Sequence, residues 1–503
     1  MQRNIMKDTI LLTVIQMTLD GLGLLLNVFM TDALGTEAIG VLSLTGSFFS
    51  LASITASGNV FLCASRFISE ELGKPSRDPS RVLSYCMCVS LAMSLLTALV
   101  ILLFAPFFSE KFLHDTALTS PIRMMAAALP LLTITACMRG YFNACCYTKI
   151  CAASDTIGFL VRCVLMAFCV WWITPVSGAA ICYMTAFCTV GGSLATLIYL
   201  LCCFRKCRIP RSGSVSITLP CYVRLAVPVM AGSALTSILS SANDALVPIT
   251  LQQAGNSTGE ALSQFGIFEA IIIPTLFFPS TILCSLSGIL VTETARESAA
   301  CNKIRITSLS EKVLRQTVVF AVFVTALFLL FGRELGELLG GGEIGGKMIM
   351  LLAPVVPFIY LEIVLESIIK GMGAQAFSSL NYLAEYIIRI SAVLVCIPLF
   401  GFYGIVISYY ASNVCGNLAR LWMVIKKTDL RPQWEKLLGI PVFSAVFAIQ
   451  LLNAAFAVLR IEPDGGVVKM CIYGVLCGCV YLLVQRMLFS LGSHQQTTIP
   501  ELL

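Results

Sequence analysis

The chain has 503 residues, of which 58% are hydrophobic and 12% are charged. Soluble domains carry about 25% charged residues, so this composition excludes a soluble protein and predicts a polytopic membrane protein. The net charge of +6 predicts no nucleic-acid partner, because most basic residues fall in the loops between apolar segments, as membrane topology requires.

The 22 cysteines predict neither a disulfide scaffold nor a metal site. Most lie inside apolar runs, where a thiol acts as a small hydrophobe. The cluster of Cys202, Cys203 and Cys207 lacks partners for zinc, since the two histidines of the chain are His114 and His494. The sequence also lacks a nucleophile–base pair and a phosphate-binding loop. We therefore expect no enzyme, no cofactor and no bound metal.

Apolar segments long enough to cross a bilayer, which takes about 20 residues, occur about fourteen times. Two stretches, 163–204 and 390–419, contain no charged residue, and each is interrupted by a turn that contains proline and glycine; the first is long enough for two crossings. We expect an all-α protein of about fourteen transmembrane helices. The predicted spans are 8–30, 38–64, 82–107, 121–142, 152–173, 178–203, 222–249, 262–290, 314–332, 348–370, 376–398, 402–425, 437–458 and 468–489.

Lysine and arginine are distributed unequally between the two sets of loops. The set that includes the N-terminus carries 24 of the 33 basic residues, and the opposite set carries 6. The remaining three are Arg162, Arg389 and Arg420, which lie inside predicted helices. The positive-inside rule then places both termini in the cytoplasm. We expect a multi-pass protein of the bacterial cytoplasmic membrane.

The chain contains an internal repeat. The stretch 138–181 recurs in diverged form as 369–407, and the alignment pairs Arg162 with Arg389. Each copy holds six helices, an even number, so the two copies share one orientation in the membrane. We expect four parts: an N-lobe at 1–204, a cytoplasmic linker at 205–221, a C-lobe at 222–428, and two additional helices with a tail at 429–503.

Arg162 and Arg389 are the main candidates for substrate binding. Inserting an arginine at the centre of a membrane helix costs about 2.5–3.5 kcal/mol of free energy on insertion scales. Each of these two arginines must therefore be solvated or serve a function. Glu385 precedes Arg389 by one turn, which favours an ion pair that is purely structural. Asp155 precedes Arg162 by seven residues, too far for an easy contact within one helix. Arg162 is therefore the less well neutralised of the two.

Other polar residues share single faces of predicted helices. Asp20 and Asn27 lie on one face of the first helix together with Gln16 and Gly23. Glu362 belongs to a second polar face on the tenth helix. Such a face cannot contact lipid tails and must line a protein interior or a hydrated cavity. Asp20, Asn27 and Glu362 are therefore further candidates for substrate binding; for Asp20 the structural alternative is a protonated, hydrogen-bonded carboxyl.

Several segments recur in an order and spacing that is typical of one family. They include LGTEAIGVLSLTGSFFSLASITASG at 34–58, MRGYFNA at 138–144, DTIGFLVR at 155–162 and IIKGMGAQ at 368–375. Over residues 5–430 the chain resembles the multidrug/oligosaccharidyl-lipid/polysaccharide flippase superfamily, and within it the stage V sporulation protein B and polysaccharide-exporter branch. The resemblance implies two six-helix lobes around a cavity that opens to one side at a time.

The resemblance also implies a function, namely flipping of a polyprenyl-pyrophosphate-linked oligosaccharide or peptidoglycan precursor for envelope polysaccharide or spore cortex synthesis. Cavity arginines would hold the pyrophosphate, a role that Arg162 and Arg389 could fill, and the two extra helices would form a groove for the lipid tail. The implied partners are the lipid-linked sugar, membrane lipids and a coupling H⁺ or Na⁺, and we expect a monomer. Asp20 leaves open the alternative of a multidrug/cation antiporter coupled to H⁺ or Na⁺.

Overall fold

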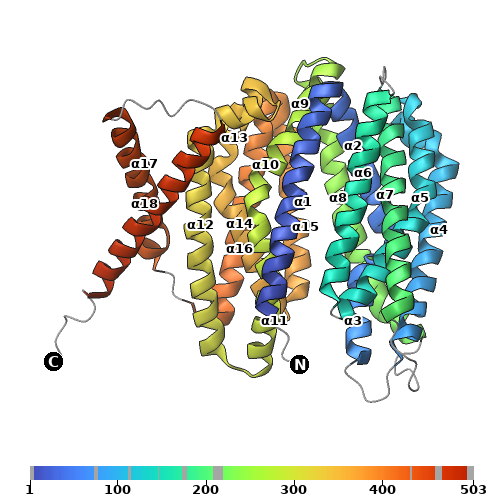
Figure 1. The fold of residues 1–503 in the computed structure, drawn as a ribbon, viewed down its shortest axis with the longest axis horizontal. Coiled ribbons are helices and arrows are strands. Elements are labelled where there is room, and N and C mark those ends of the chain that lie inside the picture. The colour runs from blue at the N-terminus through green and yellow to red at the C-terminus, as the bar shows by residue number, and fades with distance from the viewer. Residues whose placement is uncertain are drawn as a thin grey trace. The chain divides into compact units, whose positions relative to one another are not determined.

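The computed structural model describes residues 5–72, 78–111, 115–145, 147–172, 178–207, 219–430, 433–458 and 467–494. Every regular element within these ranges is a helix (Figure 1), as expected for an all-α membrane protein. Most of the predicted linker, most of the predicted turn at 174–178 and the end of the C-terminal tail lie outside the described residues.

The helices follow one another along the chain with short connections. Their bounds are α1 Ile5–Leu34, α2 Thr36–Ser57, α3 Val60–Leu72, α4 Pro79–Lys111, η1 Thr116–Leu118, α5 Thr119–Ala144, α6 Thr148–Trp172, α7 Gly178–Cys207, α8 Leu219–Gln253, α9 Thr258–Ile267, η2 Phe268–Ile272, α10 Ile273–Phe277, η3 Phe278–Ser280, α11 Thr281–Ala299, α12 Lys303–Leu338, α13 Gly342–Leu352, η4 Ala353–Val355, α14 Val356–Gly371, α15 Gln375–Phe400, η5 Gly401–Tyr403, α16 Gly404–Thr428, η6 Glu435–Gly439, α17 Ile440–Val458 and α18 Val467–His494.

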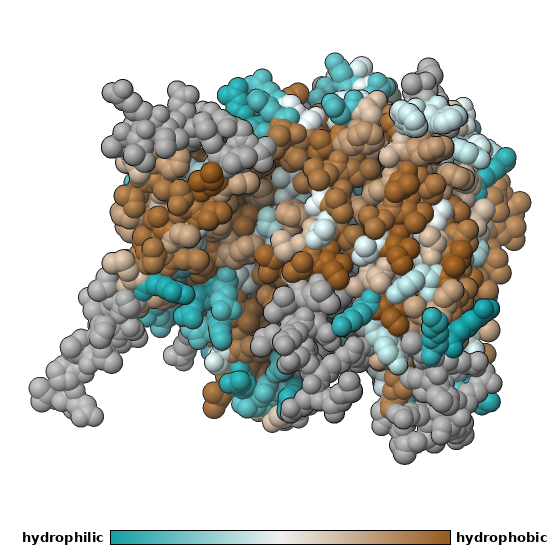
Figure 2. All heavy atoms as spheres, viewed as in Figure 1, coloured by the Kyte–Doolittle hydropathy of each residue, from teal (hydrophilic) through white to brown (hydrophobic). Residues whose placement is uncertain are grey.

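The predicted spans all fall on helices. Twelve segments of the described residues are long and apolar enough to cross a membrane, and one of them, Gln375–Thr428, has 54 residues and contains both α15 and α16. The remaining predicted span is α8, which is 35 residues long. Apolar side chains cover the middle of the visible face in Figure 2, and hydrophilic side chains lie toward its two ends. The chain is therefore a multi-pass membrane protein.

Breaks in the α-helix divide the predicted spans 38–64, 262–290 and 348–370. Gly58 and Asn59 both adopt left-handed backbone angles, with φ of 56° and 54°, and they divide the span 38–64 between α2 and α3. A π-helical turn precedes Pro274, and a 3₁₀ turn at Pro354 separates α13 from α14. Proline has no N–H to donate to the preceding turn, so the helix changes its hydrogen-bonding pattern there. Hydropathy alone does not register these breaks.

The contacts group the chain into two compact units. The first contains Met1–Pro274 and Ile390–Ile405, and the second contains Thr275–Arg389 and Val406–Leu503. This division does not coincide with the predicted lobe boundary near residue 205, because α8 and α9 pack against α2 within the first unit. The two lobes expected from the repeat remain a prediction.

The repeat is visible in equivalent contacts inside each unit. A Cβ added to Gly140 of α5 would lie 2.8 Å from the carbonyl oxygen of Phe61 on α3. A Cβ added to Gly371 of α14 would lie 2.8 Å from the carbonyl oxygen of Val291 on α11. Members of the second pair follow those of the first by 231 and 230 positions. In both copies a glycine thus allows two helices to approach backbone to backbone, which is common in membrane helix packing.

Polar contacts and glycines join α2 to α8 and α9 within the first unit. The hydroxyl of Ser241 on α8 donates to the carbonyl oxygen of Ser47 on α2 at 3.0 Å. At the start of α2, a Cβ on Gly40 would overlap the carbonyl oxygen of Leu262 on α9, and a Cβ on Gly266 would lie 2.5 Å from the Gly40 nitrogen. Small residues are therefore required on both helices at this crossing.

We expect Gly40→Val to destabilise the first unit by about 1–3 kcal/mol or more, because the new side chain meets backbone atoms that cannot move aside. Thermal unfolding of the purified protein in detergent measures this effect. Gly46→Val is the matched control, since Gly46 lies on the same helix and a Cβ there would meet nothing within 4 Å. Equal unfolding temperatures for the two variants would contradict the close crossing.

Candidate functional site

Arg162 lies in the middle of α6, and its side chain is partly exposed. Its guanidinium carbon is 5.5 Å from the centroid of the Phe159 ring, one turn earlier on the same helix. In the described part of the chain, no carboxylate pairs with this guanidinium. Asp155 instead pairs with Arg139 of α5, with 2.5 Å between Nη2 and Oδ1. Arg162 thus keeps its charge available at membrane depth, as its spacing from Asp155 predicted.

Arg389 lies at the corresponding position of α15, but it is held by neighbours. Its Nε donates to the Ser412 hydroxyl of α16 at 2.9 Å, and its Nη2 lies 3.6 Å from Glu385 Oε1. The Tyr409 ring packs against the guanidinium, with 4.5 Å from Cζ to the ring centroid. The side chain is 16% exposed. The ion pair expected from the four-residue spacing of Glu385 and Arg389 therefore forms.

Arg420 of α16 is the buried centre of a larger ion-pair network in the second unit. Its side chain is 0% exposed. Its Nη2 lies 3.2 Å from Glu362 Oε1 and 2.9 Å from Glu385 Oε2, and its Nε lies 3.4 Å from Glu366 Oε2. The Tyr382 ring lies against the guanidinium, with its centroid 4.7 Å from Cζ. One arginine thus joins three carboxylates from α14 and α15.

The charges of this network balance. Glu366 also contacts Lys370 at 3.2 Å and accepts a hydrogen bond from Ser378. Three carboxylates therefore meet three cations, counting Arg389 on α15. Glu362, which we named as a candidate for substrate binding, is a member of this network through Arg420. The sequence places Arg420 inside a predicted helix but gives no sign of its role, because its partners come from other helices.

The second copy of the repeat places Glu385 and Arg420 of this network where the first copy is uncharged. A Cβ on Gly192 of α7 would lie 2.6 Å from the carbonyl oxygen of Gly158 on α6. A Cβ on Gly416 of α16 would lie 2.7 Å from Glu385 Oε2 on α15. Each glycine therefore faces the same turn of its neighbour, the turn just before the membrane arginine. That turn holds a glycine in the first copy and a carboxylate in the second.

The residue one turn after each of these α7 and α16 glycines differs in the same way. Thr196 of α7 faces Gly158, on which a Cβ would overlap the threonine hydroxyl. That hydroxyl donates to the carbonyl oxygen of Gly192 in its own helix at 3.0 Å and to that of Ser154 on α6 at 3.3 Å. The counterpart in the second copy is Arg420, which bonds Glu385. The first copy therefore has a neutral, close-packed contact, and its membrane arginine has no carboxylate one turn away.

The polar residues of α1 have partners inside the first unit. Asp20 Oδ1 accepts a hydrogen bond from Gln16 Nε2 at 2.8 Å. Asn27 Nδ2 donates to the carbonyl oxygen of Ala270 at 3.0 Å. That carbonyl lies four residues before Pro274, which has no N–H to offer it. Asn27 thus caps a carbonyl that the proline leaves without its usual donor, which gives it a structural role besides any role in binding.

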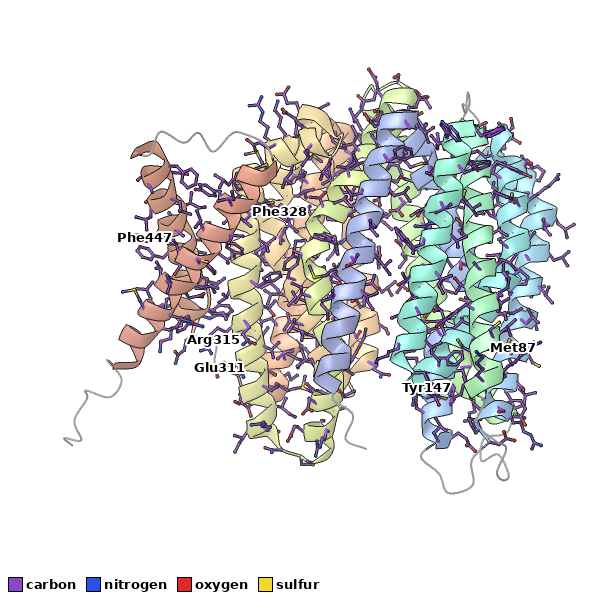
Figure 3. The ribbon with its side chains drawn as sticks, viewed as in Figure 1. Met87, Tyr147, Glu311, Arg315, Phe328 and Phe447 are labelled. Atoms are coloured by element: carbon purple, nitrogen blue, oxygen red, sulfur yellow. The ribbon has the colours of Figure 1, made fainter. Side chains whose placement is uncertain are left out.

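A long cavity lies within the second unit, between α12, α14, α16, α17 and α18, and has a volume of about 1680 Å³. Apolar side chains of all five helices line it, including those of Val319, Leu365, Leu421, Ile449 and Leu482. The Tyr481 hydroxyl of α18 donates to the carbonyl oxygen of Val319 at 2.9 Å and so ties α18 to α12. The charged residues Glu311 and Arg315 line the cavity near the beginning of α12 (Figure 3).

Comparison with known proteins shows which families the chain is similar to. Residues 5–249 match the family described as "Polysaccharide biosynthesis protein". Stage V sporulation protein B of Bacillus subtilis (strain 168) is 22% identical over 404 residues, which cover 78% of each chain. Both matches agree with the resemblance to the multidrug/oligosaccharidyl-lipid/polysaccharide (MOP) flippase superfamily that the sequence shows. The family resemblance seen in the sequence is thereby confirmed.

Solved structures share the fold of this chain over nearly its whole length. The lipid II flippase MurJ, in an inward closed conformation, has a TM-score of 0.71 at 12% identity and covers 96% of this chain and 99% of its own. A multidrug resistance MATE family transporter in an inward-facing conformation has a TM-score of 0.63 at 16% identity and covers 82% and 95%. The protein therefore has the fold of these two membrane transporters.

Proposed function

We propose that the protein flips a polyprenyl-pyrophosphate-linked oligosaccharide or peptidoglycan precursor across the bacterial cytoplasmic membrane by alternating access, with both termini in the cytoplasm. The observation that carries this proposal is the Arg162 guanidinium, which lies at membrane depth with no carboxylate partner in the described part of the chain. A cation that is costly to insert and is not neutralised has a function by default. Its natural ligand is an anion that must cross the same apolar region.

A pyrophosphate headgroup fits that requirement. It carries about two negative charges, and an isolated charge in an apolar medium is strongly unfavourable unless it is paired. Arginine stays protonated and presents a planar set of donors that can bind two phosphate oxygens at once. In this proposal Arg162 of the first copy binds the pyrophosphate, and Arg389, its counterpart in the second copy, is a further candidate for binding phosphate.

The alternative function is a multidrug/cation antiporter, and Asp20 is the residue that favours it. An acidic residue in the first helix can bind a cation or a proton, and Asp20 accepts a hydrogen bond from Gln16. The two functions require opposite charges in the substrate. Proteoliposomes loaded in parallel with a fluorescent polyprenyl-pyrophosphate disaccharide and with a cationic dye distinguish them. We expect transfer of the lipid-linked sugar between leaflets and no dye transport; the opposite result would reject the flippase.

We also propose that the cavity beside α17 and α18 accommodates the apolar tail of the substrate. Its lining is apolar over most of its length, and both helices lie outside the repeat. Deleting residues 431–503 should leave a core that still inserts into the membrane but no longer flips the substrate. Deleting 495–503 alone is the control and should leave flipping intact. Full activity of the larger deletion, in the same proteoliposome assay, would show that this cavity is not needed.

A further inference from the structure

We infer that Glu385 is a tethered counter-anion for Arg389. The phosphate of the substrate displaces the Glu385 carboxylate from Arg389 on binding, and the carboxylate returns to Arg389 on release. This inference rests on the proposed function and adds to it a residue that sets the affinity and the release of the anion. Glu385 lies on α15, one turn before Arg389, and its carboxylate contacts two arginines.

The two contacts of Glu385 are unequal. Its Oε2 accepts a hydrogen bond from Arg420 Nη2 at 2.9 Å, whereas its Oε1 is 3.6 Å from Arg389 Nη2, beyond hydrogen-bonding distance. A phosphate oxygen that comes within hydrogen-bonding distance of Arg389 therefore offers it a stronger interaction than Glu385 does. The Arg389 side chain retains some exposed surface, at 16%, whereas Glu385 and Arg420 are almost fully buried. Arg389 is thus the end of the network that a ligand can reach.

A place for the displaced carboxylate already exists. Arg420 Nη1 is buried and has no hydrogen-bond partner among the described residues. A Cβ on Gly416 would lie 2.7 Å from Glu385 Oε2 and 3.0 Å from Arg420 Nη1, so the glycine leaves both atoms room at the same spot. When Glu385 leaves Arg389, it can take a second donor from Arg420 and form a bidentate pair. The exchange leaves neither Arg389 nor Glu385 as an uncompensated charge.

The first copy has no such competitor. Gly158 stands where Glu385 stands in the second copy, and Arg162 has no carboxylate partner in the described residues. In the first copy an anion therefore meets an arginine that has no carboxylate partner in the described residues, and in the second copy it meets an arginine that is paired with Glu385. Glu385 thus limits how tightly Arg389 can bind the anion. A limited affinity is what a transporter needs in order to release its substrate on the far side.

Calorimetric binding of inorganic pyrophosphate to the purified full-length protein tests this inference. Glu385→Gln keeps the size of the side chain and removes its charge, while Glu362 and Glu366 still pair with Arg420. We expect Glu385→Gln to bind pyrophosphate about tenfold more tightly than the wild type. Flipping of the lipid-linked sugar should then show a lower KM and a lower kcat, a split that a merely structural role would not produce.

Two further variants make the test specific. Glu337→Gln on α12 removes an exposed carboxylate that pairs with Arg333 in the same four-residue spacing, and it should change nothing. Arg389→Gln introduced into Glu385→Gln should remove the gain in affinity, because the two effects act through one arginine. Unchanged or weaker pyrophosphate binding by Glu385→Gln, with an unchanged unfolding temperature, would overturn the inference.

The same measurements separate this inference from the proposed function. If Arg162→Gln loses pyrophosphate binding but Glu385→Gln equals the wild type, Arg162 remains the anion site and the counter-anion is wrong. If Glu385→Gln gains affinity through Arg389 while Arg162→Gln binds normally, the counter-anion holds and the role of Arg162 is wrong. If the wild type and Glu385→Gln both fail to bind pyrophosphate, both are wrong.

Discussion

Arg162→Ala is expected to lower the rate of flipping of a polyprenyl-pyrophosphate sugar by roughly 100-fold or more. Losing one partner of a buried, hydrogen-bonded charge pair costs about 2–5 kcal/mol, and each 1.4 kcal/mol corresponds to a factor of ten. The protein should stay folded and inserted, because Arg162 has no carboxylate partner in the described residues that the substitution would leave unpaired. Reconstituted proteoliposomes, with the amount of inserted protein quantified, measure both properties.

Three further variants, one of them a control outside the site, make this result more specific. Arg162→Lys keeps the charge but loses the planar arrangement of donors, so it should retain an intermediate rate. Arg123→Ala, at an exposed arginine near the start of α5, controls for loss of a positive charge and should flip normally. Asp20→Asn should also flip at close to the wild-type rate. A large loss with Asp20→Asn and a small one with Arg162→Ala would instead support the antiporter.

Arg420→Met is expected to destabilise the protein by about 3–5 kcal/mol, the usual loss when one partner of a buried ion pair is removed. The substitution leaves Glu366 and Glu385, which are 6% and 5% exposed, without their common cation. Lys370 and Arg389 can compensate only in part, since each contacts one of the two carboxylates. Denaturant titration in mixed micelles, or thermal unfolding in detergent, gives the size of the effect.

The destabilisation by Arg420→Met should depend on the stranded carboxylates. Replacing Glu366 and Glu385 by glutamine in the same variant removes those charges and should restore a large part of the lost stability. Arg333→Met is the matched control, because that arginine is 67% exposed and its pair with Glu337 lies at the surface; we expect a change of at most about 1 kcal/mol. Equal unfolding behaviour of the two arginine variants would contradict the network.

The composition and the periodicity of the sequence determine the class of protein and most of its helices. A bilayer requires long apolar segments whose backbone groups bond within the helix, so each span can be recognised from its own residues. The pairing of Glu385 with Arg389, and that of Glu366 with Lys370, also follow from the sequence, because residues four apart on a helix are neighbours. For the same reason the isolation of Arg162 from Asp155 could be predicted.

Tertiary structure alone decided which residues meet across helices. The Arg420 network joins one residue of α16 to three carboxylates on α14 and α15, and no local spacing indicates that these helices are neighbours. Asn27 meets the carbonyl oxygen of Ala270, which lies 243 positions later in the chain. Helix periodicity assigns a residue to a face, but the packing of other helices decides what that face contacts. The packing of the helices therefore decides which residue pairs with a buried charge, whereas the sequence alone predicts that such a charge needs a partner.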